Sequence, residues 1–497
     1  MATIERTELA PGLEISRVLT GLWQVADLER DGSTLDADAA AEELERYAAA
    51  GLTTFDMADH YGSSELIAGR FAERGNAARS ELLTKWVPAP GTHTRADVRE
   101  AVERALERMS QDRLDVLQFH AWSYPDPAWL DCMFFLQELK EEGLIGHLGL
   151  TNTDTAHVRM LLDSGIDVVS NQICYSLLDQ RAAGAMAELC EERGVGILAF
   201  GTLAGGFLTE RWLGAAEPSM SSLETWSQMK YKRFVDTAGG WSRLQELLRA
   251  VDRAAKRLDV SMANVSVRYM LESPAVAGVI VGARLGRSAH IEDTARLFDF
   301  ELDEESLSEI RGALAKMQPI PGDCGDEYRR PPFLTAAGDL SDHFESMPSP
   351  YPVHQGPGDR ERALSGTIWE DLAGFSRAVR KGNRIFVSGT TATHGDRLIG
   401  GESAMSQAYY CLDKIEGAIQ SLGGTLDDVV RTRIYVPRPS DAEDISRAHG
   451  DRLGHVQPAN TLVQAGLIGD GYLVEMEAEA VVDGSAGSAS ADARDAS

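Results

Sequence analysis

The chain has 497 residues, 43% of them hydrophobic and 25% charged, and a formal net charge of −29. This length exceeds a single ordinary domain and predicts two or more hydrophobic cores. The acidic excess, 77 Asp and Glu against 48 Lys and Arg, argues against nucleic acid or an anionic membrane as partner, because both need clustered cations.

The N-terminus and the cysteines narrow the cellular setting. The first residues, MATIERTELAPG, lack the basic and then apolar pattern of a signal peptide, and no run of eighteen apolar residues predicts a membrane span. The five cysteines have no CxxC spacing, which favours reduced thiols over a disulfide framework or a metal site. We therefore expect a cytoplasmic protein without a bound metal.

Eight short apolar segments alternate with amphipathic stretches from about residue 15 to residue 300. In chain order they are SRVLTGLWQ, LTTFDMAD, SELLTKWV, LDVLQFHAW, GHLGLTN, IDVVSNQICY, GVGILAFGTL and AGVIVGAR. Several of the stretches between them end in glycine, the residue that best accepts a left-handed helix end. Eight strand–helix units predict an α/β fold, a (β/α)8 TIM barrel, over residues 1–318.

The regions beyond this repeat differ in character. An insertion, residues 206–240, follows the seventh strand and can act as a lid. Residues 319–360 are rich in Pro and Gly, so they form a linker or a tail docked over the barrel mouth, and the segment DEYRRPPF favours docking. Residues 361–483 alternate short strands with two helices, which predicts a small α+β domain. The tail 484–497 is small and polar and is expected to be disordered.

Four polar residues lie at or just after strand ends in the first quarter of the chain, where a barrel of this type places its chemistry. They are Asp56, Tyr61, Lys85 and His120. An ammonium beside a tyrosine favours the phenolate, and a carboxylate keeps that ammonium charged and in place. We interpret Tyr61 as the proton donor to a carbonyl oxygen and Lys85 as the ammonium that assists it. Asp56 then pairs with Lys85, and His120 orients the carbonyl.

These segments resemble the aldo-keto reductase superfamily. FDMADHYG is similar to its Asp and Tyr-Gly segment, TKW to its Lys strand and QFHAW to its His strand. The resemblance covers residues 10–320. It implies a TIM barrel that uses NADPH or NADH without a Rossmann fold and interconverts an aldehyde or ketone and an alcohol. A cofactor-sensing regulatory barrel, which some members are, is the alternative.

The same resemblance implies a set of cofactor contacts along the later strand ends. They are Thr151, Asn152, Gln172, Phe200, Gly201, Leu203, Gly205, Gly282, Arg284, Arg287 and Asp293. The first three match positions that hold the nicotinamide carboxamide, and the phenylalanine matches an aromatic residue that stacks on the nicotinamide. Arg284 and Arg287 can neutralise a 2′-phosphate, which favours NADPH, or they can lie on a solvated surface.

Three tryptophans adjoin strand ends at the predicted barrel mouth. They are Trp23, Trp86 and Trp122. We expect them to line an apolar pocket for a small carbonyl substrate, with ordinary core packing as the alternative.

A second resemblance covers residues from about 360 to 483. GFSRAVRKGNRIFVSGT, LGGTLDDVVRTRIYV and VEMEAEAVV resemble the Rid (reactive intermediate deaminase) family. This implies a chorismate-mutase-like fold, a homotrimer and pockets between subunits. Gly389, Thr390 and Glu477 match its pocket positions, whereas Asn460 stands where active deaminases have Arg. An amide cannot offer a substrate carboxylate the charged hydrogen bonds of Arg, each worth roughly 1.5–3 kcal/mol.

Two functions therefore stay open for the second domain. It serves oligomerisation or ligand binding, which the absence of the Arg favours, or it hydrolyses an enamine or imine and supplies the carbonyl compound to the barrel. Arg431 and Arg433 lie on one strand and can replace the missing Arg, although strand arginines at subunit contacts are commonly structural.

Overall fold

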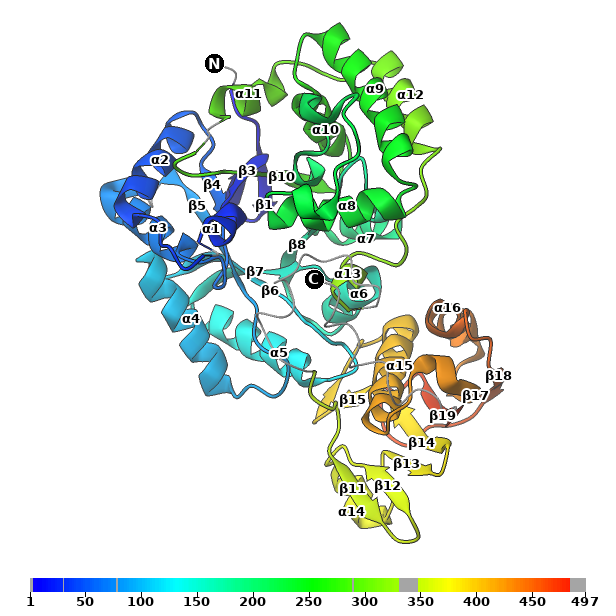
Figure 1. Cartoon of the computed structure of the whole chain (residues 1–497). Helices are drawn as coiled ribbons and strands as arrows, with labels where there is room; N and C mark the ends of the chain where they lie inside the picture. Colours follow the sequence, from blue (N-terminus) through cyan, green and yellow to red (C-terminus); the bar gives the residue numbers. More distant parts are fainter. Residues whose placement is uncertain (1–2, 30, 77–78, 288–289, 330–346, 483–497) are drawn as a thin grey trace.

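The structure of the chain is a computed structural model that describes residues 3–29, 31–76, 79–287, 290–329 and 347–482. The tail expected over residues 484–497 and part of the expected segment 319–360 lie outside these residues. An N-terminal barrel and a smaller C-terminal domain follow one another along the chain (Figure 1).

Eight parallel strands close into the barrel, in the order β10-β3-β4-β5-β6-β7-β8-β9. They are β3 (Val18–Gly21), β4 (Thr54–Asp56), β5 (Glu81–Trp86), β6 (Leu114–Phe119), β7 (Ile145–Thr151), β8 (Val168–Cys174), β9 (Gly196–Phe200) and β10 (Val276–Gly282). Each coincides with one apolar segment of the sequence, and β8 is buried along its whole length, as a strand covered on both faces should be. The predicted (β/α)8 barrel is confirmed.

Amphipathic helices surround the barrel (Figure 1). They include α2 (Ala37–Ala49), α3 (Ser64–Phe71), α4 (Arg95–Met109), α5 (Ala128–Glu141), α6 (Thr155–Asp163), α7 (Ala185–Arg193), α9 (Trp241–Leu258), α10 (Met262–Leu271) and α12 (Glu304–Leu314). In α4, Thr94 and Asp97 form a capping box that satisfies the first amides of the helix. Its buried residues Val98, Val102 and Met109 recur at helical spacing and form the face turned to the core.

A hairpin that the sequence did not suggest closes one end of the barrel. It consists of β1 (Arg6–Ala10) and β2 (Leu13–Ser16). Its Leu9 and Ile15 pack with Leu83 and other side chains from the barrel interior. Because this is the end at which the strands begin, a ligand has access from the opposite end, where the strands finish.

Two segments outside the strand–helix repeat lie at that open end. Helix α8 (Trp226–Thr237) belongs to the insertion after β9, and α13 (Asp326–Arg329) follows the last barrel helix. Lys230 from α8 and Tyr328 from α13 both line the cavity at the strand ends. The insertion and the segment after the barrel therefore both contribute walls to the site.

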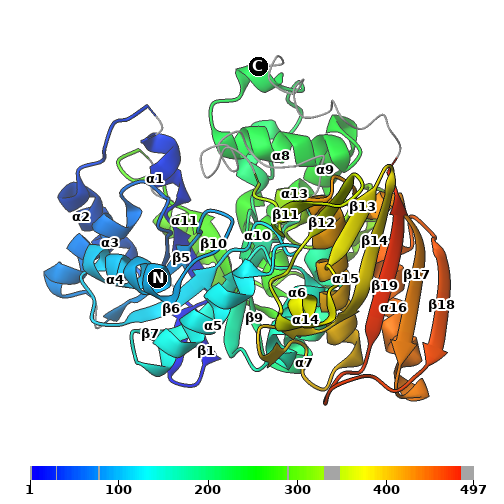
Figure 2. The same ribbon diagram turned by 90° about the horizontal axis from the view of Figure 1, so that it is seen from below.

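The C-terminal domain is built on a seven-stranded sheet in the order β11-β12-β13-β14-β19-β17-β18. Its strands are β11 (Val353–Gly356), β12 (Arg360–Ala363), β13 (Ala378–Lys381), β14 (Arg384–Thr391), β17 (Val429–Val436), β18 (Ala459–Gln464) and β19 (Glu475–Val481). Strands β17 and β18 run parallel and the other neighbours antiparallel. Helices α15 (Ala404–Ser421) and α16 (Ala442–Leu453) cover one face (Figure 2). The predicted α+β class is confirmed.

Strand β11 lies inside the segment expected to be a linker or tail. Its sequence VHQG has no apolar alternation, and its side chains are largely exposed at the edge of the sheet. A strand with no buried face leaves no period in the sequence, which explains why the sequence did not indicate it.

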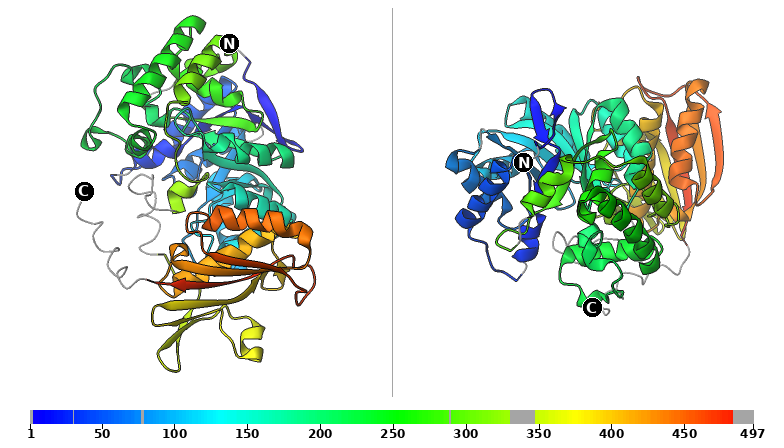
Figure 3. Two further views of the ribbon diagram at one scale, coloured as in Figure 1. Left: turned by 90° about the vertical axis from the view of Figure 1, so that its right-hand side faces the viewer. Right: turned by 90° about the horizontal axis from the view of Figure 1, so that it is seen from above.

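The two domains pack on one another through α15, which lies between the C-terminal sheet and the barrel (Figures 2 and 3). Within the described residues, no helix is both long and apolar enough to cross a bilayer. The five cysteines are buried and unpaired, as their spacing predicted.

Candidate active site

Three of the four predicted catalytic residues form one buried group. Lys85, on β5, donates from Nζ to both carboxylate oxygens of Asp56 and to the carbonyl oxygen of Met57, each at 2.8 Å. The same ammonium lies 4.7 Å from the centre of the Tyr61 ring. Asp56 is the last residue of β4 and Tyr61 follows in the next loop, so adjacent strand ends bring the three together.

The Asp56 carboxylate is held by more than the lysine. Its Oδ1 also accepts hydrogen bonds from Gln118 Nε2 at 3.2 Å and Gln172 Nε2 at 2.6 Å. Burial lowers the pKa of Lys85, and the negative charge of Asp56 opposes that shift. Gln118 was missed in the sequence, where its only signal is a lone amide inside the apolar strand LDVLQF.

His120, the fourth residue, follows β6 and is buried. Its Nδ1 lies 3.3 Å from the carbonyl oxygen of Thr151, and because a carbonyl oxygen only accepts, Nδ1 carries a proton. The ring meets Trp122 edge-on with centroids 4.4 Å apart and Tyr328 with centroids 5.5 Å apart. The imidazole is thus fixed in orientation by one backbone acceptor and two aromatic side chains.

A cavity of about 390 Å³ opens at the strand ends, within the range of small-molecule sites. It is lined by Asp56 and Tyr61 and by most of the predicted cofactor residues. Those are Thr151, Asn152, Gln172, Phe200, Gly201, Leu203, Gly205, Gly282 and Arg284. Two side chains of the catalytic group and most of the predicted cofactor positions therefore share one cavity.

The polar groups of this cavity fit a nicotinamide cofactor. Among the described residues, none donates to the buried Oδ1 of Asn152 or to the buried Oε1 of Gln24, so two acceptors stand ready for amide or hydroxyl donors. Phe200 lines the same cavity. Gly201 has φ +70° and a Cβ there would lie 2.0 Å from Tyr231 Oη, so the loop after β9 requires glycine at this point.

The basic residues predicted for the adenosine end lie in different settings. Arg284 lines the cavity together with His290, which the sequence had not suggested. Arg287 is exposed and is not among the residues that line this cavity. The carboxylate of Asp293 accepts hydrogen bonds from Ser261 and Asn264 at the start of α10.

The three predicted pocket tryptophans lie in different surroundings. Trp23 lines the cavity. Trp122 packs on His120 and donates from Nε1 to the carbonyl oxygen of Pro88 at 3.0 Å. Trp86 packs against Phe119 in the core, next to the catalytic group.

Two residues that the sequence analysis did not single out complete the cavity. The Lys230 ammonium donates to Tyr328 Oη at 2.5 Å and lies 5.4 Å from the centre of the Phe200 ring. Lys230 is only 7% exposed although it comes from the insertion after β9. Their position depends on how two long segments fold back over the barrel, which no local period reveals.

The residues predicted for the second-domain pocket make contacts within their own domain. A Cβ on Gly389 would lie 2.1 Å from Glu475 Oε1, and Thr390 is buried in the same strand, β14. Glu477 instead accepts from Arg433 at 2.8 Å and from Tyr435 at 3.0 Å. Asn460 donates to Thr432 Oγ1 at 2.9 Å within its own domain.

Comparison with known proteins agrees with this geometry. A family model described as the aldo/keto reductase family matches residues 17–315. The chain belongs to the aldo/keto reductase family. A second model, described as endoribonuclease L-PSP, matches residues 369–482, so this aldo/keto reductase carries a C-terminal Rid-type domain, as its sequence predicted.

Relatives are found for both parts of this aldo/keto reductase. An uncharacterized protein of Streptomyces coelicolor is 38% identical over 120 residues of the C-terminal region, which make up 24% of this chain and 90% of that protein. The 6-dehydroglucose reductase of Agrobacterium fabrum is 32% identical over 243 residues, 44% of this chain and 78% of that protein. The chain is thus an oxidoreductase.

A solved structure matches the barrel. The glycerol dehydrogenase of Gluconobacter oxydans covers 65% of this aldo/keto reductase, over 98% of its own chain, with a TM-score of 0.53 and 20% identity. At this identity the likeness concerns the fold.

Proposed function

We propose that this chain interconverts an aldehyde or ketone and an alcohol, with the reaction centred on Tyr61. The observation that carries the proposal is the buried Lys85–Asp56 pair, whose ammonium lies 4.7 Å from the Tyr61 ring centre. Positive charge at that distance favours the phenolate, so the phenol gives its proton to a carbonyl oxygen more readily. A nicotinamide cofactor held in this cavity would supply or accept the hydride.

The remaining residues bind and orient. His120 orients the carbonyl oxygen beside Tyr61, its ring being fixed by Thr151 and Trp122. Asn152 presents its buried Oδ1 to the carboxamide of the cofactor, with Thr151 and Gln172 beside it. Phe200 gives the nicotinamide ring a stacking face.

NADPH is the proposed cofactor, and NADH remains an accepted substitute. Arg284 supports this choice because it lines the cavity and its buried Nε has no hydrogen-bond partner among the described residues. A guanidinium pairs well with a phosphate oxygen pair. In a chain with a net charge of −29, such a local cation is needed to attract an anionic cofactor.

For the Rid-type domain we propose oligomerisation, as a homotrimer, and ligand binding. Its sheet exposes large apolar side chains, among them Phe386 (41%), Val430 (45%) and Val463 (41%), which favours contact with further copies. Two contacts within one subunit support this role. Glu477 is paired with Arg433 and Asn460 is hydrogen-bonded to Thr432, so the polar groups of these two predicted pocket residues are already satisfied.

Imine or enamine hydrolysis by the Rid-type domain is the second candidate. It is favoured by Glu475, a partly buried carboxylate whose pKa is raised by burial, directly against Gly389. A carboxylate of this kind can take part in proton transfer. The full chain carrying Tyr61→Phe is assayed for hydrolysis of imines. Because this change removes the proposed proton donor of carbonyl reduction, the assay tests hydrolysis by the Rid-type domain separately.

The proposed function is tested by incubating the purified chain with NADPH or NADH and a set of aldehydes and ketones, and following oxidation of the cofactor. We expect turnover with at least one carbonyl class and a lower KM for NADPH than for NADH. No turnover in either direction with any carbonyl or alcohol, despite tight cofactor binding, would favour the regulatory alternative.

A further inference from the structure

Helix α6 joins the cofactor site of the barrel to the C-terminal domain. It starts at Thr155, three residues after Asn152, and its N-cap is Asp154. At its other end, Asp163 accepts a hydrogen bond from Ser406 of the C-terminal domain at 2.7 Å. The same helix therefore touches the nicotinamide loop at one end and helix α15 along its length.

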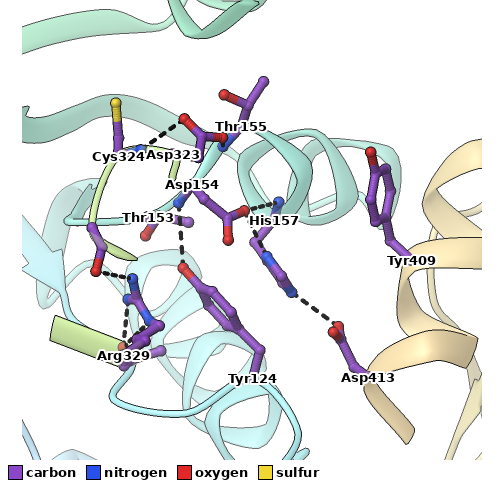
Figure 4. A network of polar contacts seen from close by, with 12 residues as sticks. Tyr124, Thr153, Asp154, Thr155, His157, Asp323, Cys324, Arg329, Tyr409 and Asp413 are labelled. Atoms are coloured by element: carbon purple, nitrogen blue, oxygen red, sulfur yellow. Dashed lines mark hydrogen bonds and ion pairs between the residues drawn. The ribbon is translucent and has the colours of Figure 1, made fainter. Parts of the chain in front are cut away.

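His157, on the first turn of α6, bridges the two domains (Figure 4). Its Nδ1 lies 2.6 Å from Asp154 Oδ1 in the barrel, and its Nε2 lies 2.9 Å from Asp413 Oδ2 on α15. The histidine is 2% exposed and Asp413 is 1% exposed. A neutral imidazole cannot donate to both carboxylates, so the geometry calls for the imidazolium.

The charges around His157 agree with this form. Burial alone would lower the pKa of His157, but Asp154 and Asp413 raise it to about 9. Asp413 is itself fixed by the Arg452 guanidinium from α16, and the pKa values of both carboxylates are held below their usual range by these cations. Tyr124 stacks on the ring with centroids 3.4 Å apart and is not an ionised neighbour, because burial raises its pKa.

The same contacts continue toward Asn152. The Asp154 amide donates to Tyr124 Oη at 3.3 Å, and the Arg329 guanidinium lies 4.2 Å from the centre of the Tyr124 ring (Figure 4). Arg329 in turn donates to the carbonyl oxygen of Asn152 at 2.5 Å. Gly325 sits against that oxygen so closely that a Cβ would lie 1.9 Å from it.

Asn152 needs such support. Its φ is +54°, in the left-handed region that residues other than glycine seldom adopt. Such a conformation persists only when its surroundings hold it. Here Arg329 and Gly325 hold the carbonyl side of the residue, and Asp154, tied to His157, fixes the chain two residues later.

We propose that Asp413 of the C-terminal domain is a positioning residue for the nicotinamide site of the barrel, acting through His157 and Asp154 on the loop 151–154. This rests on the proposed function, since Asn152 binds the carboxamide there. The Rid-type domain is then a required part of the reductase site, because its α15 supplies the outer carboxylate that keeps the loop in its binding conformation.

The test compares two variants of the full chain that each remove one inter-domain His–Asp contact. Asp413→Asn breaks the contact to His157, and Asp131→Asn breaks the contact between α5 and His394, 2.7 Å in length, at a part of the interface that does not lead to the loop. Both weaken the domain interface, so both are expected to lower Tm. Only Asp413→Asn should disturb residues 151–154.

Two measurements are made on each variant. Amide hydrogen exchange of the peptide covering residues 151–158 in the free chain should become about 5- to 50-fold faster in Asp413→Asn and stay at the wild-type rate in Asp131→Asn. The Kd for NADPH, measured by quenching of tryptophan fluorescence, should rise by about the same factor in Asp413→Asn alone. Equal changes in the two variants, or none, would overturn the proposal.

Two further variants keep the outcome decisive. If Asp413→Asn does not fold, Arg452→Lys loosens Asp413 from within the C-terminal domain and should give a smaller change of the same kind. Asn152→Ala tests the cofactor site itself. If it leaves the Kd for NADPH unchanged, the proposed cofactor site is wrong. If it weakens binding while Asp413→Asn and Arg452→Lys do not, only the positioning role fails.

Discussion

Lys85 Nζ lies 2.8 Å from both carboxylate oxygens of Asp56, in a part of the barrel where both side chains are almost fully buried. Each charge stabilises the other in this setting, because either charge alone would be costly to bury. The pair is the reason that an ammonium stands next to Tyr61.

Replacing Asp56 by Asn should therefore damage both catalysis and stability. Without its counter-ion the buried ammonium loses its charge or its place, so we expect kcat to fall by about 100-fold or more and the free energy of unfolding to fall by about 3–5 kcal/mol. Steady-state kinetics and urea unfolding measure the two. The control Glu81→Gln, which breaks the Arg6–Glu81 ion pair at the closed end of the barrel, should lower stability and spare kcat. A kcat within twofold of wild type in Asp56→Asn would contradict the role of the pair.

The His157 imidazolium should make stability depend on pH. Its pKa is raised to about 9 in the folded chain and lies near 6.5 when unfolded. Its contribution is therefore complete below pH 6.5, declines as pH rises from there, and is lost above pH 9, a change on the order of 3 kcal/mol. Urea unfolding of wild type and His157→Gln at pH 6 and pH 9.5 checks this: the advantage of wild type should shrink at the higher pH. An advantage that is equal at both pH values would contradict a raised pKa of His157 in the folded chain.

Lys230 should select among carbonyl substrates. Its ammonium lies in the cavity wall that also contains Tyr61 and Phe200, and a charged hydrogen bond contributes roughly 1.5–3 kcal/mol. In Lys230→Met we expect kcat/KM for an aldehyde that carries a carboxylate to fall by about 10-fold or more, with little change for a neutral aldehyde of the same size. An equal loss for both aldehydes would indicate that Lys230 only supports the wall.

The Rid-type domain should assemble the chain. Light scattering of wild type should give three times the chain mass of 54.0 kDa. Phe386→Glu places a charge on the exposed face of β14 and should release monomers. Leu66→Glu, at another exposed apolar site, on the barrel helix α3, is the control and should leave the mass unchanged. A measured wild-type mass equal to that of one chain would contradict the trimer.

The sequence could predict the barrel because its strands are covered on both faces and so appear as continuous apolar segments, β8 most clearly. It could also place Asp56, Lys85 and His120 at neighbouring strand ends, since the strand order of a closed barrel follows the chain. Strand β11 left no such pattern, because its polar side chains face solvent.

Side chains that reach the site through folding over long distances could not be read in this way. The sequence suggested that the insertion and the segment after the barrel lie over the barrel mouth, but it did not single out Lys230 or Tyr328 as the side chains that line the cavity. His157 and Asp413 are 256 residues apart in the sequence. Each looks like an ordinary surface residue of an amphipathic helix, and only the packing of the two domains makes them a buried pair.

The central claim, that Tyr61 is the proton donor of a carbonyl reductase site, is tested most directly by Tyr61→Phe. This change removes the phenol oxygen and keeps the ring that lies over Lys85. We expect kcat for carbonyl reduction to fall by about 100- to 10,000-fold, with the Kd for NADPH within twofold of wild type by tryptophan fluorescence. Carbonyl reduction at the wild-type rate in Tyr61→Phe would contradict the account.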